Sequence, residues 1–423
     1  MNKLIKILTS LRLTVVCLCF GIALVFIGTI AQVDEGLYQA QNRYFRSLLV
    51  FWSPTGSHLH IPIFPGGYLV GGLLLANLIA AHISRFKLTK NKIGILLAHF
   101  GLILLFIGQF ATDIFSHESA MRLNEGESKN YSEAFRETEL AIVDTSDTNT
   151  DRVIAVSESL LAEKKTIQSD KLPVTINVKN FWPNANLFRT PAIATNIPQG
   201  TILPKDLGVT GGDLDGYCVM PQPLVTDTEH RNIPAALVEF LDGDKSLGTY
   251  LLTAALDANQ TLDINGKPYE VALRFEREYY PFSLTLLKAT HEKYKGTDVP
   301  KNFASRIRLE NPEKHEARET VIYMNNPLRY AGLTFFQYQM DPLEMSRATS
   351  DAGWSTFQVV RNPSWLTPYL ACVLVALGLI IQFMMHLLNF ATKRRNVPAN
   401  AKSQKGNDAK KQNVKATQEV TLS

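Results

Sequence analysis

The residue of this chain best suited to chemistry is a histidine inside an uncharged stretch. In KIGILLAHFGLILLFIGQFATD, no side chain from Ile93 to Thr112 is charged, and His99 lies in the first third of that run. An ionisable residue in a membrane-spanning helix is costly, so it is a candidate for function. A neutral imidazole in apolar surroundings can ligate a metal or haem iron, relay protons, or hydrogen-bond to a neighbouring helix.

His386 is a second candidate. It precedes Lys393 by seven residues and His99 follows Lys92 by seven, so each lies about 10 Å from a basic residue at ~1.5 Å rise per residue. This comparable depth would allow His386 to be a second ligand. The alternative is that His386 is an interfacial residue.

Three further histidines are weaker candidates. His82 lies three residues from Arg85, near the expected interface, where a histidine needs no functional explanation. His58 and His60 precede the second apolar run, and the sequence leaves their participation open.

The surrounding residues favour some of these roles over others. A proton relay needs further acids or bases along its path, and the apolar runs hold no Asp, Glu, Lys or Arg at mid-membrane. A haem ligand needs only one histidine per axial position and an apolar slot. Gly94, Gly101 and Gly108 recur every seven residues and would let a flat ring approach closely, although plain helix packing explains them equally well.

Cysteine use and missing motifs exclude several classes of protein. Only Cys218 lies outside the apolar runs, so the region between the third and fourth runs cannot form a disulfide within itself. The chain has no Cys-x-x-Cys, and therefore no thioredoxin-type centre or covalent haem attachment of its own. It also lacks the phosphate-binding loop, His-Glu-x-x-His and Gly-x-Ser-x-Gly motifs. We therefore assign no catalytic residue.

Four apolar runs must position these histidines. A spanning helix needs about 20 predominantly apolar residues, and the runs Leu13–Val33, Ile63–Ala81, Ile93–Thr112 and Leu366–Leu388 qualify. The basic residues before the first run resemble the positively charged start of a signal peptide. That run exceeds the usual apolar length of a signal peptide, however, and TIAQVDEG is a poor cleavage site, so we expect a retained helix.

The basic residues predict the orientation of the helices. Lys and Arg cluster before the first run, in SRFKLTKNK between the second and third runs, and in KRR after the fourth. Because Lys and Arg mark cytoplasmic loops, we expect both termini on the cytoplasmic side of the membrane and the region between the third and fourth runs on the extracytoplasmic side.

That region reads as a mostly antiparallel β domain, because short β-branched and aromatic runs alternate with turn signals such as the Asn-Gly of DINGKPYEV. RNIPAALVEF is the most ambiguous stretch, since it could also be helical. The predicted fold class is thus four transmembrane helices plus a large extracytoplasmic β-rich domain. The predicted boundaries are 1–33 (N-terminus and first helix), 34–62 (outer loop), 63–112 (second and third helices), 113–363 (β domain), 364–390 (fourth helix) and 391–423 (disordered basic tail). The tail is too poor in apolar residues to fold, and its basic residues could touch anionic lipid.

Several motifs, in order, resemble the ResB (CcsB) family of the system II cytochrome c maturation pathway. SLRLTVVCLCFGIALVFIGTIAQ resembles its first helix, and LLAHFGLILLFIGQF followed by MRLNEGES resembles its third. PKNFASRIRL and NNPLRYAGLTFFQYQMDP resemble the second half of its outer domain. Between about Asp144 and Thr261 we recognise no family motif, and Arg306 stands where an acidic residue is common.

The resemblance implies that His99 is an axial haem ligand and that the chain is a subunit of a cytochrome c haem lyase (synthetase) complex. The implied partners are a ResC/CcsA-type membrane protein, apocytochrome c and a thiol-reducing thioredoxin-like protein, with the lipid bilayer around the helices and no nucleic acid. Haem b would be the bound and transported substrate. The other open class is a non-catalytic membrane scaffold or receptor whose β domain binds protein without binding haem. We expect the Asn326–Gln337 stretch to be a packed core strand after a Pro-Leu turn, with no catalytic role for Arg329 or Tyr330.

Overall fold

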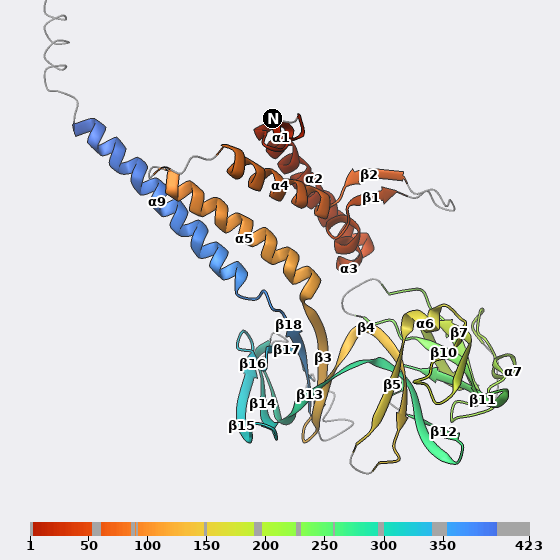
Figure 1. The fold of residues 1–423 in the computed structure, drawn as a ribbon. Helices are drawn as coiled ribbons and strands as arrows, with labels where there is room; N and C mark the ends of the chain where they lie inside the picture. Colours follow the sequence, from red (N-terminus) through yellow and green to blue (C-terminus); the bar gives the residue numbers. More distant parts are fainter. Residues whose placement is uncertain are drawn as a thin grey trace, which may run out of the picture. The chain divides into compact units, whose positions relative to one another are not determined.

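The structure, a computed structural model, describes residues 3–52, 61–85, 89, 92–147, 150–189, 197–225, 230–256, 259–294, 300–340 and 353–395 (Figure 1). The chain divides into two compact units. The helical unit comprises residues 1–25, 46–115 and 363–423, and the β unit comprises residues 26–45 and 116–362. His58 and His60 lie outside the described residues.

Four helices are long and apolar enough to cross a membrane. They are α2 (Leu11–Glu35), α4 (Gly67–Arg85), α5 (Ile93–Phe115) and α9 (Thr367–Arg395). A β-rich region separates α5 from α9 in the chain. This confirms the predicted fold class and makes the chain a multi-pass membrane protein.

Two predicted helix boundaries differ from the structure. Residues Ile61–Pro65 form strand β2, paired with β1 (Leu49–Trp52), and α4 begins only at Gly67. Pro65 disfavours helical backbone at the residue before it, which explains the late start. At the other end of the chain, α9 continues to Arg395, so the segment predicted to be disordered from 391 begins as helix; its remainder lies outside the described residues.

A buried asparagine holds the start of the chain against α4. The short helix α1 (Lys3–Leu8) is separated from α2 by a break at Thr9 and Ser10. Asn77, which is 4 % exposed, donates from Nδ2 to the Leu8 and Ser10 carbonyl oxygens at 2.5 and 3.2 Å. Its Oδ1 accepts from Thr14 at 2.6 Å. The amide therefore gives the Leu8 carbonyl a partner at the helix break and adds a second donor to the Ser10 carbonyl, which also accepts from the Leu13 backbone.

Helices α5 and α9 lie side by side in antiparallel directions (Figure 1). The three glycines that recur along α5 are its buried residues, and they face α9. A Cβ atom at Gly94 would lie 2.6 Å from the Gly378 carbonyl oxygen, and one at Gly101 would lie 2.8 Å from that of Ala371. The glycine repeat is therefore a close helix-packing surface, as small residues are in membranes.

The β unit is built around a ten-stranded antiparallel sheet. Its main path is β15 (Glu316–Tyr323), β14 (Pro300–Asn311), β13 (Lys267–Lys293), β4 (Ser128–Asp144), β3 (His117–Asn124), β18 (Trp354–Arg361), β17 (Leu333–Met340) and β16 (Leu328–Tyr330). Strands β12 (Gln260–Ile264) and β5 (Arg152–Ser157) pair with β13 and β4 off this path.

Smaller elements complete the β unit. One sheet has the order β11 (Lys245–Thr253), β10 (Ala235–Asp242), β7 (Thr175–Trp182) and β6 (Thr166–Ile167), and β8 (Ala185–Arg189) pairs with β9 (Tyr217–Pro221). The short helices are α3 (Leu37–Ala40), the π-helix η1 (Gln41–Phe45), α6 (Glu158–Ala162) and α7 (Pro204–Leu207). The ambiguous RNIPAALVEF stretch thus contributes a strand, β10, which is almost entirely buried.

The long strands β4 and β13 run through two lobes of this unit (Figure 1). In one lobe their Leu140, Ile142, Val271 and Leu273 pack against the smaller sheet. In the other lobe, Leu284 and Leu286 of β13 pack with side chains of β3, β14, β15, β17 and β18. The predicted Asn-Gly turn joins β12 to β13, with φ of 55° at Asn265 and 78° at Gly266, as a tight hairpin requires.

Candidate functional site

The structure brings His99 into contact with a second histidine in the helical unit. His99 extends from α5 and His82 from α4, and the distance between His99 Nδ1 and His82 Nε2 is 3.1 Å. The ring centroids are 4.9 Å apart, with the ring planes almost perpendicular at 85°. Both side chains are partly buried. The two imidazoles therefore form a hydrogen-bonded pair between neighbouring helices.

Contacts at the other ends of α4 and α5 fix the alignment of the two helices that brings His82 and His99 together. The Tyr68 hydroxyl donates to an Asp113 carboxylate oxygen, and the Tyr68 and Phe110 rings meet edge to face at 6.3 Å. Arg46 Nε lies 2.9 Å from the other oxygen of Asp113. Because the helices are antiparallel, a fixed contact at Tyr68 places His82, fourteen residues later, near the start of α5, where His99 lies.

The partners of the two rings identify which nitrogen atoms carry protons. His82 Nδ1 is 2.8 Å from the Leu78 carbonyl oxygen, which can only accept, so His82 Nδ1 carries the proton. In a neutral ring His82 Nε2 then accepts, and His99 Nδ1 must donate to it. This leaves His99 Nε2 as an unprotonated nitrogen, and it makes no hydrogen bond within the part of the chain that is described.

This arrangement leaves one ring nitrogen, His99 Nε2, that could ligate a metal such as a haem iron. Ligating histidines usually donate their other ring N–H to an acceptor that fixes the tautomer, as His99 does. An axial haem position takes one such nitrogen. Among the described residues, no three His, Cys, Asp or Glu side chains gather as a protein metal site would need.

His386 and His99 lie at different positions along the axes of the paired helices α5 and α9. The α5–α9 packing places Gly101 opposite Ala371 and Val375, so His99, two residues earlier, is level with about residue 375 of α9. His386 is eleven residues further along (386 − 375), or about 16 Å at ~1.5 Å per residue. Its ring is exposed, and its Nε2 accepts from Gln382 Nε2 at 2.8 Å on the same helix. The flanking basic residues predicted that His386 and His99 lie at a comparable depth. The packing of α5 on α9 shows that this prediction is wrong.

The contact of His82 with His99 was not predicted from the sequence, in which His82 was interpreted as an interfacial residue. Distance from the nearest charge predicts depth along one helix but not which face of that helix meets a neighbour. The available signal was one histidine on each of two consecutive helices joined by a short loop, since such helices pack antiparallel.

Family-like motifs in the β unit converge on a buried polar cluster. Ser305 of β14 donates to Gln337 Oε1 of β17 at 2.7 Å, and Gln337 Nε2 donates to Ser355 Oγ of β18 at 2.7 Å. The two serine hydroxyls are 2.8 Å apart and fully buried. Because each group donates to the next, the ring of three is closed and satisfied, which is the condition for a stabilising buried network.

The Asn326–Gln337 motif is a hairpin of β16 and β17, with the turn at Ala331 and Gly332 (φ 50° and 79°). Leu328, Leu333 and Phe335 are buried in the core of that lobe, as expected for a packed strand.

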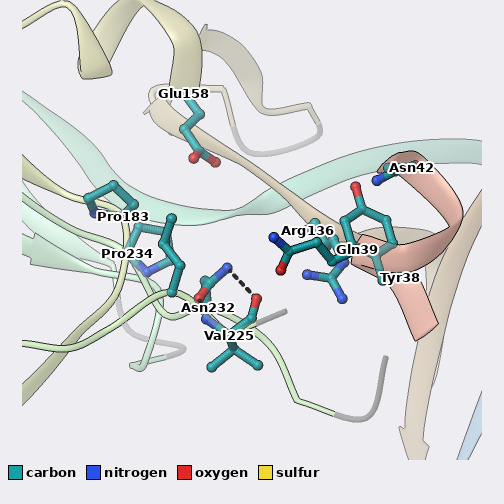
Figure 2. A pocket seen from close by; sticks show the side chains of 10 residues that line it. Tyr38, Gln39, Asn42, Arg136, Glu158, Pro183, Val225, Asn232 and Pro234 are labelled. Carbon is teal, nitrogen blue, oxygen red and sulfur yellow. Dashed lines mark hydrogen bonds between the residues drawn. The ribbon is translucent and has the colours of Figure 1, made fainter. Parts of the chain in front are cut away.

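A cavity of about 400 Å³ lies in the β unit (Figure 2). It is lined by Tyr38, Gln39, Asn42, Arg136, Glu158, Pro183, Leu224, Val225, Asn232 and Pro234. The Arg136 guanidinium lies 4.0 Å from the centre of the Tyr38 ring, and Glu158 accepts from the backbone and hydroxyl of Thr138. Several of these residues belong to the stretch 144–261, for which only short strands were predicted from the sequence.

Comparisons with known proteins agree with the motifs. The model of the ResB-like family matches residues 253–352, which include β14 to β17 and the Ser305 and Gln337 positions. The chain is 25 % identical over 313 residues to Protein NrfI of Wolinella succinogenes, an alignment that covers 73 % of this chain and 29 % of NrfI. This chain thus spans less than a third of that relative's length.

The family match covers the second half of the β unit, and the alignment with the relative covers about three quarters of the chain. The chain also has the four spanning helices, with the β region between the third and fourth. It is therefore a multi-pass membrane protein whose residues 253–352 match the ResB-like family.

Proposed function

We propose that this chain is the membrane subunit that, with a ResC/CcsA-type partner, binds haem b through His99 and presents it for attachment to apocytochrome c in a system II pathway. The observation that carries the proposal is the free Nε2 nitrogen of His99, held in the tautomer that ligation needs. That nitrogen lies in an apolar helix, where an unpaired polar group is costly.

The orientation of the chain supports haem entry from the cytoplasmic side. The clusters of Lys and Arg favour cytoplasmic termini and a cytoplasmic α4–α5 loop in a bacterial inner membrane. His99, near the start of α5, is then on the cytoplasmic side of the bilayer, and the β unit is extracytoplasmic. Haem held at His99 would be received from within and passed outward.

The second axial ligand is best supplied by the partner chain. His386 is offset from His99 by about 16 Å along the helix axes at ~1.5 Å per residue, while two axial nitrogens on one iron are about 4 Å apart at roughly 2 Å per bond. Ile95 and Leu102, which lie four residues before and three residues after His99 on the same face of α5, are exposed in this chain and offer an apolar surface for a partner helix.

Attachment itself needs little from this chain's side chains. The sulfur of each apocytochrome cysteine bonds to one vinyl carbon of haem, and the thiol proton goes to the neighbouring carbon, so no leaving group or net redox change is involved. Reduced cysteines, maintained by a thioredoxin-like reductant, and correct proximity account for the reaction. The lack of a nucleophile–base pair in the sequence motifs is consistent with this division of roles.

The test is the visible absorption of the complex. The chain is expressed with its partner, purified in mild detergent, and its Soret band compared with that of His99→Ala and His386→Ala. We expect loss of the band in His99→Ala only, with both variants still co-eluting with the partner. Equal loss in both variants would support pairing within the chain instead.

The alternative class, a scaffold that binds protein through its β unit, is supported by the cavity of Figure 2, which polar and apolar side chains line together. It leaves the His82–His99 pair without a role. A colourless wild-type complex that still binds apocytochrome would support this alternative and rule out haem binding.

A further inference from the structure

We infer that His82 is a positioning residue for His99: it accepts the Nδ1 proton of His99 and so fixes the ring and leaves Nε2 open to the haem iron. This inference rests on the proposed haem role of His99. It adds a residue of α4 whose function is carried by a hydrogen bond and not by direct ligation.

The hydrogen bonds form a directional chain. Leu78 O accepts from His82 Nδ1 at 2.8 Å, and His82 Nε2 accepts from His99 Nδ1 at 3.1 Å, both within the ordinary range. This series of hydrogen bonds starts at the Leu78 carbonyl, four residues before His82, so its first acceptor is part of the α4 backbone. The direction of both bonds follows from that first acceptor.

This series of hydrogen bonds has two consequences for a ligand at His99. An acceptor on Nδ1 makes the imidazole more basic at Nε2 and restricts rotation of its ring. In apolar surroundings consecutive hydrogen bonds polarise one another, which strengthens this effect. Loss of such an outer hydrogen bond typically weakens metal affinity about 10–100-fold.

His82 is poorly placed to be the ligand itself. Its Nε2 lies 3.1 Å from His99 Nδ1, and its Nδ1 faces the Leu78 carbonyl, so both ring nitrogens are engaged. Ligation by His82 would require breaking the contact with His99.

The first test uses two substitutions at position 82 in the full chain with its partner. His82→Phe keeps a ring of similar size and removes the acceptor, whereas His82→Gln retains an acceptor oxygen. We expect His82→Phe to bind haem about 10–100-fold more weakly and to shift the reduction potential to more positive values, because a less basic ligand stabilises ferric iron less. His82→Gln should restore both properties at least in part.

The outcomes separate this inference from the proposed function. If His99→Ala loses the Soret band but His82→Phe keeps wild-type affinity and potential, the positioning role is wrong and the haem role stands. If His99→Ala keeps the band, the haem role fails. If His82→Phe abolishes haem binding and His82→Gln rescues neither property, His82 is a ligand and not a positioning residue.

A second measurement needs neither haem nor a variant at position 82. The haem-free wild-type chain is labelled with ¹⁵N-histidine in lipid, and the His99 signals are assigned by their loss in His99→Ala. We expect His99 protonated at Nδ1 and unprotonated at Nε2, with a coupling across the Nδ1–H···Nε2 bond to His82. A His99 ring protonated at Nε2 would overturn the inference even if His82→Phe did not fold.

Discussion

Tyr330, in the most specific motif of the sequence, joins two elements of the β unit through its hydroxyl. The hydroxyl donates to Glu316 Oε2 at 2.9 Å and accepts from Asn311 Nδ2 at 2.9 Å. The hydrogen bond from Tyr330 is the largest cause that holds the pKa of Glu316 below its usual value, followed by the hydrogen bond from Arg318. The motif therefore stabilises the fold at this point.

Tyr330→Phe should destabilise the chain at neutral pH and make its stability depend less on pH than that of the wild type. Because the folded-state pKa of Glu316 is depressed, its ionisation contributes stability above the unfolded value near 4.5, and this contribution is lost as pH falls through the folded pKa. Without the hydroxyl the folded pKa rises toward 4.5 and the contribution shrinks. Relative to the wild type, the thermal unfolding midpoint of Tyr330→Phe should be lowered more at pH 7 than at pH 3.

Glu316→Gln is the matched background for this prediction. In that background Tyr330→Phe should cost the same at every pH, about 1–3 kcal/mol for the Asn311 amide left without an acceptor. A pH-dependent loss that persists without Glu316 would contradict the assignment.

At this scale the sequence can single out a residue but does not predict the contacts that the residue makes. His99 could be singled out because charge is absent for a full spanning length around it. Its hydrogen bond to His82 could not be predicted, since it depends on which faces of α4 and α5 meet. The offset of His386 likewise depends on the α5–α9 register, which is set by glycine contacts and not by distance from a lysine.

Among the elements, the packing of α5 on α9 depends on backbone-to-backbone approach. Gly101→Ala would place a Cβ 2.7 Å from Val375 Cγ2 and 2.8 Å from the Ala371 carbonyl oxygen. A side chain can rotate away but a helix carbonyl cannot, so the helices must separate. We expect a cost of about 1–3 kcal/mol, as for overpacking, seen as a lower unfolding temperature in detergent.

Gly72→Ala in α4 is the control, because a Cβ there meets nothing within 4 Å. It should leave stability unchanged or raise it by about 0.5–1 kcal/mol through helix propensity. Equal effects of the two substitutions would show that the glycine repeat is not a packing surface.

Element boundaries were predictable only where local chemistry decides them. The Asn265–Gly266 turn follows from two positions that need positive φ, and the structure has that turn. The residues 63–65 were predicted to begin a helix, yet pairing with β1 and the presence of Pro65 make them part of strand β2. The cavity of the β unit combines Tyr38 with residues from 136 to 234, and such long-range assembly leaves no local signal.

For the whole molecule, the distribution of basic residues predicts that the β unit and the α4–α5 loop lie on opposite sides of the membrane. Single cysteines test this in a chain whose four native cysteines are replaced. Asp244→Cys, in the exposed turn between β10 and β11, should react with an impermeant maleimide on spheroplasts. Thr89→Cys should react only after the membrane is opened, and the reverse pattern would invert the topology.

The central claim is that His99 Nε2 ligates haem, and chemical rescue tests it most directly. His99→Gly, purified with the partner chain and supplied with haem, should lack the wild-type Soret band and regain it, with the low-spin spectrum, when imidazole fills the space left by the side chain. His386→Gly should keep the band without imidazole. A His99→Gly complex that retains the wild-type haem spectrum with no imidazole added would contradict the account.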